Sequence, residues 1–114
     1  MCSIHGDPDG TRQIVVNLVR NAKAAVAAIG TGQVTLDVYT DGRKGIVVVE
    51  DSAGSLSPAI AKQLFSPFFS AKSEGGIGVG LYASRMIAER MRGSLRVSHA
   101  EGIYTRFELE VPVV

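Results

Sequence analysis

The strongest constraint on the fold of this chain is the spacing of its apolar residues between positions 12 and 29. They recur at helical intervals, as Ile14, Val15, Leu18, Val19, Ala22, Ala25, Val26 and Ile29. Gly30 follows the last of them as a stop signal. This pattern predicts one long helix with a buried face, and such a helix needs a second layer against which to pack.

Two hairpins, the first of them rich in valine, are the candidates for that layer. They cover residues 34–40 with 45–51, and residues 94–99 with 104–111. Turn sequences, Asp41-Gly42 and Glu101-Gly102, separate the two halves of each hairpin. The spacing therefore predicts four strands that are mostly paired with their sequence neighbours.

Two further helices are expected between the hairpins. Ser57 followed by Pro58 predicts the start of a short helix that ends near Leu64, and helical spacing resumes over residues 78–92. The complete order predicts an α+β fold, a two-layer sandwich with helices on one face of a mixed, mostly antiparallel sheet.

Length and charge limit the possible functions. The 114 residues form one domain, 1–114, and the formal net charge of +1 gives no reason to expect nucleic acid or an anionic membrane as partner. The one cysteine, Cys2, allows no internal disulfide and supplies too few thiolates for a zinc cluster. This cysteine usage fits a reducing setting, so we expect a cytoplasmic domain. The chain lacks an apolar stretch long enough to span a membrane, although the domain could be part of a membrane-anchored kinase.

Two asparagines lie beside the apolar face of the long helix. Asn17 and Asn21 are one turn apart, within an arc of about 40°, whereas Arg20 and Lys23 point toward solvent. An amide oxygen is a suitable ligand for Mg²⁺ that also carries phosphates. The simpler interpretation, that both amides bond backbone groups or water, is favoured for an isolated pair.

A carboxylate and a glycine-rich segment are the other candidate ligand-binding features. Asp51 ends an apolar strand, where it could accept a hydrogen bond from an exocyclic amino group such as that of adenine, or simply form a turn. Gly76, Gly78 and Gly80 lead into Leu81 at the start of a helix, a pattern typical of anion binding but also of a plain connector. Lys72 would add a positive charge.

Taken in order, these segments resemble the ATP-binding catalytic domain of sensor histidine kinases. That domain has the Bergerat-type fold that gyrase, a class of heat-shock chaperones and mismatch-repair ATPases share. NLVRNA at residues 17–22 resembles the N box, VVVEDSAGSL the first glycine box, LFSPFFSAK the F box and GGIGVGL the second glycine box. The closing strand of the family is similar to the segment with Thr105, Phe107 and Pro112. The NLVRNA sequence is most similar to that of the nitrogen-regulation and oxygen-sensing kinases.

The resemblance implies a role for each candidate residue. Asn21 would coordinate Mg²⁺, Asn17 would support the phosphates, and Asp51 would bind the adenine amino group of ATP. The phosphates would be held by Lys72, Gly76, Gly78, Gly80 and Leu81. The implied activity is transfer of the γ-phosphoryl group to a histidine on a separate dimerisation domain of the same kinase, with a response regulator downstream. No catalytic residue beyond the nucleotide site is implied. The resemblance implies that residues 1–114 are a fragment of a longer kinase, and this fragment is not expected to phosphorylate itself.

Several positions depart from the family pattern and leave two other interpretations open. Ala53 and Ser55 stand where the family has glycines, and Ala24 occupies a usually polar position. His5 and His99 are expected to be surface residues instead of phosphoacceptors. The alternatives are a kinase-like interaction module that has lost ATP binding, and a serine kinase of the anti-sigma-factor type.

Overall fold

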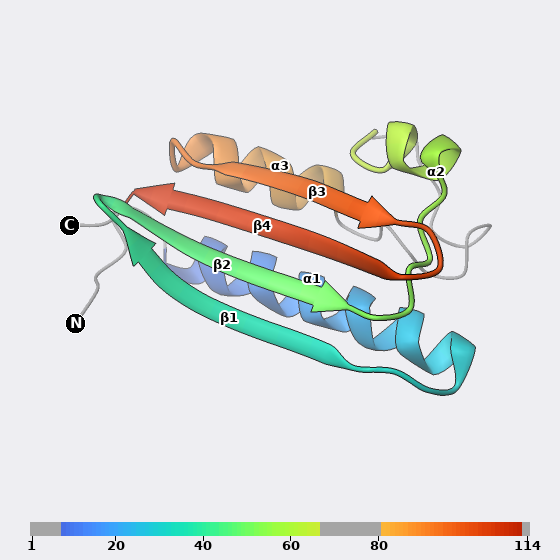
Figure 1. Cartoon of the computed structure of the whole chain (residues 1–114). Helices are drawn as coiled ribbons and strands as arrows, with labels where there is room; N and C mark the ends of the chain where they lie inside the picture. The colour runs from blue at the N-terminus through green and yellow to red at the C-terminus, as the bar shows by residue number, and fades with distance from the viewer. Residues whose placement is uncertain (1–7, 67–80, 113–114) are drawn as a thin grey trace.

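The computed structural model describes residues 8–66 and 81–112 (Figure 1). Its elements are α1 (Pro8–Ile29), β1 (Val34–Asp41), β2 (Lys44–Asp51), α2 (Pro58–Gln63), α3 (Leu81–Arg90), β3 (Ser94–Ala100) and β4 (Tyr104–Pro112). All the predicted helices and strands are therefore present, with small differences at their ends. Lys72, Gly76, Gly78 and Gly80 lie outside the described residues, so their expected roles stay predictions.

The described strands form one sheet with the order β1-β2-β4-β3. Each neighbouring pair is antiparallel, including β2 with β4, which are far apart in the sequence. Figure 1 shows α1 and α3 on the same face of this sheet. The predicted two-layer α+β sandwich is confirmed, and within the described residues its sheet is antiparallel throughout.

Helix α1 begins at Pro8, earlier than the predicted start at Arg12. Proline suits the first helical turn because the backbone N–H that it lacks would have no partner there. Asp9 lies in the same turn, where its negative charge stabilises the positive end of the helix. At the other end Gly30 has a φ of 93°, and its N–H donates to the carbonyl oxygen of Val26 at 2.9 Å. Glycine is suited to this conformation, so the predicted stop is confirmed.

The core lies between the two main helices and the inner face of the sheet. Its fully buried side chains include Ile14 and Leu18 from α1, Leu81 from α3, and Val49 and Leu109 from the central strands. These aliphatic side chains hold α1 and α3 side by side on the sheet. Packing of this kind fixes α1 in position, and with it every polar side chain that α1 carries.

An aromatic contact holds the segment after α2 against the sheet. Ser57 caps α2 as predicted, because its Oγ accepts a hydrogen bond from the Ile60 N–H at 3.2 Å. Beyond α2, the Phe65 ring meets the Phe107 ring of β4 edge-on, with centroids 6.4 Å apart. The Arg85 guanidinium of α3 lies 4.7 Å from the centroid of Phe65. Phe65 thus connects α3 to the central strand β4.

The outer face of the sheet carries cross-strand ion pairs, and β1 is an edge strand of the described sheet. Cross-strand ion pairs join Lys44 to Glu110, Arg96 to Glu108, and Arg106 to Glu50. On β1, Leu36 and Val38 are 51% and 66% exposed. None of the helices in the described part of the chain is long and apolar enough to cross a membrane.

Candidate functional site

Asp51, the last residue of β2, organises the turn that follows it. Its side chain is buried, and its Oδ1 accepts hydrogen bonds from the N–H groups of Ala53 at 3.0 Å and Gly54 at 3.3 Å. Its Oδ2 accepts no hydrogen bond from the residues that the structure describes. Asp51 therefore forms the turn, as one interpretation predicted, and still has a free acceptor for a ligand.

Burial raises the pKa of the Asp51 carboxyl above its ordinary value. The two backbone hydrogen bonds oppose this effect, and the nearby charge of Glu50 adds to it. Because the folded chain holds the proton more tightly than the unfolded chain, the ionised carboxylate costs stability. A hydrogen-bond donor from a ligand would reduce that cost.

The turn after Asp51 needs a glycine at one position only. Gly54 has a φ of 62°, and its carbonyl oxygen accepts a hydrogen bond from the Gly102 N–H at 2.9 Å. A Cβ on Gly54 would lie 2.6 Å from the Gly102 nitrogen, so a larger side chain would push the β3–β4 hairpin away. Ala53 and Ser55 do not adopt positive φ, so glycine is not required at either position.

A small cavity connects Asp51 with α1 and β4. It is lined by Asn21, Ala22, Ala25, Asp51, Ser55, Leu56, Thr105 and Phe107. Its volume is about 10 Å³. That is roughly the space of one water molecule. The structure thus brings Asn21 and Asp51 together at one pocket, as expected, but a base can enter only if the walls move apart.

Two buried polar atoms in this pocket have no hydrogen-bond partner within residues 8–66 and 81–112. They are Nδ2 of Asn21 and Oγ1 of Thr105, on residues that are 6% and 4% exposed. Leaving such a group unpaired costs stability, so an unpaired buried group requires an explanation, and a ligand is one. Sequence reasoning missed Thr105 as a site residue; only the pairing of β2 with β4, which sets Thr105 opposite Asp51, places it there.

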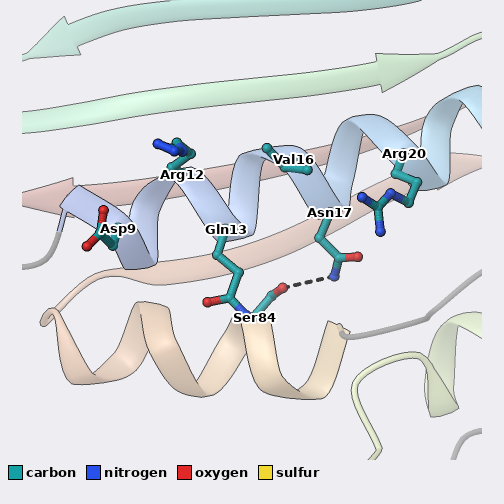
Figure 2. Close-up of a pocket in the computed structure, with 7 residues that line it drawn as sticks. All are labelled: Asp9, Arg12, Gln13, Val16, Asn17, Arg20 and Ser84. Carbon is teal, nitrogen blue, oxygen red and sulfur yellow. Dashed lines mark hydrogen bonds between the residues drawn. The ribbon is translucent and has the colours of Figure 1, made fainter.

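Asn17 lies at a different hollow from Asn21. Its Nδ2 donates to Oγ of Ser84 on α3 at 3.1 Å, as Figure 2 shows. The hollow has a volume of about 450 Å³ and is lined by Asp9, Arg12, Gln13, Val16, Asn17, Arg20 and Ser84. Leu81, the first residue of α3, is fully buried in the core, which leaves its backbone as the group that a ligand could contact.

His99 is not the surface residue that the sequence suggested. It is half-buried, and its Nδ1 is buried with no hydrogen-bond partner in the part of the chain that the structure describes. The strand register places His99 opposite Thr105, which in turn lies opposite Asp51. A row of polar side chains therefore crosses three strands on the inner face of the sheet, and no local sequence pattern signals it.

The sheet is antiparallel and carries helices α1 and α3 on one face (Figure 1). The buried carboxylate of Asp51 and the α1 residue Asn21 line one pocket. This arrangement fits the class of ATPase domain that the motifs suggested. Residues 6–114 match the family model described as histidine kinase-, DNA gyrase B-, and HSP90-like ATPase. The chain belongs to this family.

Sensor kinases are among its relatives. It is 34% identical over 113 residues to the sensor protein TorS of Escherichia coli (strain K12), and 34% identical over 110 residues to the sensor histidine kinase ZraS of the same strain. These matches cover 98% and 96% of the chain but only 12% and 23% of the two relatives. The chain thus spans less than a quarter of the length of either protein.

Solved structures confirm the fold. The catalytic domain of the histidine kinase ThkA superposes with a TM-score of 0.79 at 28% identity, covering 96% of this chain and 70% of that one. The mycobacterial sensor histidine kinase MprB gives a TM-score of 0.78 at 26% identity, covering 95% and 73%. The chain is therefore homologous to the catalytic domains of sensor histidine kinases.

Proposed function

We propose that this chain binds Mg-ATP and supplies its γ-phosphoryl group to a histidine on a separate dimerisation domain of the same kinase, in the cytoplasm. The observation that carries the proposal is the pocket in which a buried acceptor, Asp51, lies beside the unpaired hydroxyl of Thr105. Adenine offers a complementary pair, an exocyclic amino donor next to a ring nitrogen acceptor. Guanine offers an oxygen at the first of these positions, so the ionised Asp51 selects ATP over GTP.

Asn21 is the residue suited to the metal. It lines the same pocket, and its Nδ2 has no hydrogen-bond partner among the residues that the structure describes, so hydrogen bonds to those residues do not fix the orientation of the amide. Mg²⁺ prefers oxygen ligands and commonly binds through few protein groups together with substrate phosphates. One amide oxygen from Asn21, with phosphate oxygens and water, fits that preference. When bound, the ion neutralises charge that develops on the phosphates during transfer.

Phosphoryl transfer requires little covalent chemistry from the protein. The bond between the γ-phosphorus and its bridging oxygen breaks, a bond to an imidazole nitrogen forms, and ADP leaves. The role of this chain is to hold the nucleotide so that the terminal phosphate faces the acceptor. Asn17 lies one helical turn from Asn21 on the same helix, which suits a contact on the phosphate side. The response regulator acts downstream of that step.

Calorimetric titration of the chain with ATP, with and without Mg²⁺, tests the proposal. We expect magnesium-dependent binding that Asn21→Ala abolishes while the fold is retained. Gln63→Ala, which removes an amide from α2 away from the pocket, is the matched control and should bind as the unmodified chain does. The absence of any heat of binding at millimolar nucleotide would contradict the proposal.

One observation favours a second candidate, a docking module that no longer binds ATP. The pocket at Asp51 has a volume of only about 10 Å³, so a purine needs the walls formed by α1 and the turn after β2 to separate. The same titration distinguishes the two functions, because the docking module would release no heat with either ATP or GTP.

A further inference from the structure

The outward face of α1 carries a row of cations around an exposed aliphatic residue. We call this row the basic stripe, and it consists of Arg12, Val16, Arg20 and Lys23. At 100° per residue these four side chains fall within an arc of about 80°. Val16 is 47% exposed, and the three cations are exposed as well. The stripe is therefore an accessible surface with positive charge around an apolar centre.

The cations of the basic stripe differ from those of the sheet in having no ionic partner among the described residues. Arg12, Arg20 and Lys23 form no ion pair with any residue in the described parts of the chain. On the outer sheet face, by contrast, Lys44 and Arg106 each contact a glutamate. Unpaired cations grouped on one helix face attract an anionic surface and orient its approach.

Hollows lie on both sides of the stripe. One is the hollow of about 450 Å³ that also contains Asn17 and Ser84 (Figure 2). The other has a volume of about 350 Å³ and is lined by Val15, Val16, Val19, Arg20 and Lys23. Val16 and Arg20 line both hollows, so they form a ridge with a depression on each side. A ridge between depressions, apolar in its centre, suits side chains projecting from a partner helix.

The stripe also has a definite position relative to the nucleotide pocket. That pocket contacts α1 through Asn21, Ala22 and Ala25, whereas most of the stripe lies nearer the start of the helix. The proposed function puts the phosphates on the Asn17 side of the nucleotide pocket, and Asn17 lines a hollow together with Arg20. A partner seated on the stripe would thus lie next to the terminal phosphate.

We infer that the basic stripe docks an amphipathic, acidic helix of the histidine-bearing dimerisation domain. Carboxylates of that helix pair with Arg12, Arg20 and Lys23, and its aliphatic side chains cover Val16. This inference rests on the proposed function for the identity of the partner. The stripe contacts the partner protein even without nucleotide, so its residues set the choice of partner.

Charge reversal on the stripe tests the inference. The variant is Arg12→Glu/Arg20→Glu, and the matched control is Arg43→Glu/Lys62→Glu, which makes the same change of net charge on the β1–β2 turn and on α2. The histidine-bearing domain of the same kinase, prepared separately, is titrated with each protein without nucleotide, and its phosphorylation rate is then measured with Mg-ATP. We expect the stripe variant to bind and phosphorylate this domain about 10 to 100 times less well than the control.

Each outcome separates the inference from the proposed function. Equal binding of the domain by the stripe variant and the control would overturn docking at the stripe. Loss of ATP affinity in the stripe variant with unchanged nucleotide-free binding of the domain would also overturn it, because Arg12 and Arg20 would then serve only the phosphates. A concentration-dependent dimer of the chain, lost in the stripe variant, would assign the surface to a second copy instead. Failure of the unmodified chain to bind ATP refutes the proposed function, while the nucleotide-free titration still decides docking.

Discussion

Gly54 offers the sharpest test of the geometry around Asp51. Replacing it with alanine puts a Cβ 2.6 Å from the Gly102 nitrogen and 2.7 Å from the Gly102 carbonyl carbon. The left-handed backbone of Gly54 costs an alanine about 1–2 kcal/mol. Displacing the packed hairpin costs roughly a further 1–3 kcal/mol. We therefore expect Gly54→Ala to lower the free energy of unfolding by about 2–5 kcal/mol in total.

Gly42 is the matched control for this substitution. Its φ of 65° is close to the 62° of Gly54, but a Cβ there would meet nothing within 4 Å. Gly42→Ala therefore carries only the backbone term of about 1–2 kcal/mol. For a domain of this size each kcal/mol shifts the melting temperature by roughly 4 °C. Calorimetric melting should thus show a loss of about 4–8 °C for Gly42→Ala and about 8–20 °C for Gly54→Ala.

The test is the difference in melting temperature between Gly54→Ala and Gly42→Ala. Equal losses for Gly42→Ala and Gly54→Ala would mean that the β3–β4 hairpin does not approach the Asp51 turn closely. The described contact between Gly54 and Gly102 would then be wrong, together with the shape of the pocket that this turn borders.

Two further predictions concern the polar side chains of the pocket. Thr105→Val replaces an unpaired hydroxyl with a methyl group of similar shape, so denaturant unfolding should show stability unchanged or raised by about 1 kcal/mol, while ATP affinity falls about 5-fold; unaltered affinity would remove Thr105 from the site. The raised pKa of Asp51 means that its carboxyl takes up a proton at a higher pH than an ordinary aspartate does. ATP binding should therefore weaken as the pH falls through that pKa, because the protonated carboxyl is a poorer acceptor. Asp51→Asn should bind ATP more weakly and should not show this pH dependence. In the ligand-free chain, the stability that Asp51 contributes should be present at low pH. It should decline as the pH rises from the ordinary aspartate pKa through the raised one. Unfolding curves measured over a pH series would detect this decline, which Asp51→Asn should lack.

Local patterns were sufficient for most of the fold. The apolar spacing of α1 predicted its buried face, because Ile14 and Leu18 occupy that face and are fully buried. Ser57 predicted the start of α2, since a cap depends only on nearby backbone. The start of α1 was predicted too late, because Pro8 and Asp9 stabilise a first turn without adding any apolar residue.

The candidate site depended on information that no local pattern contains. Asp51 and Asn21 were connected through the family resemblance, and the structure brings them to one pocket. The positions of Thr105 and His99 could not be foreseen, because they follow from the pairing of β2 with β4 and of β4 with β3. Asn17 bonds Ser84 because α1 packs against α3, a contact between residues far apart in the sequence.

Helix α1 also limits how the chain can vary in evolution. One unbroken helix of 22 residues supplies core side chains, the wall of the Asp51 pocket and an outward row of cations. One inserted residue would rotate everything after it by about 100° and shift it by about 1.5 Å, so that the faces before and after the insertion would no longer align. An insertion or deletion between Arg12 and Asn21 would therefore disturb all three faces at once, whereas a substitution on the outward row changes one side chain. Length changes among related chains should therefore accumulate in the loops and leave this helix intact.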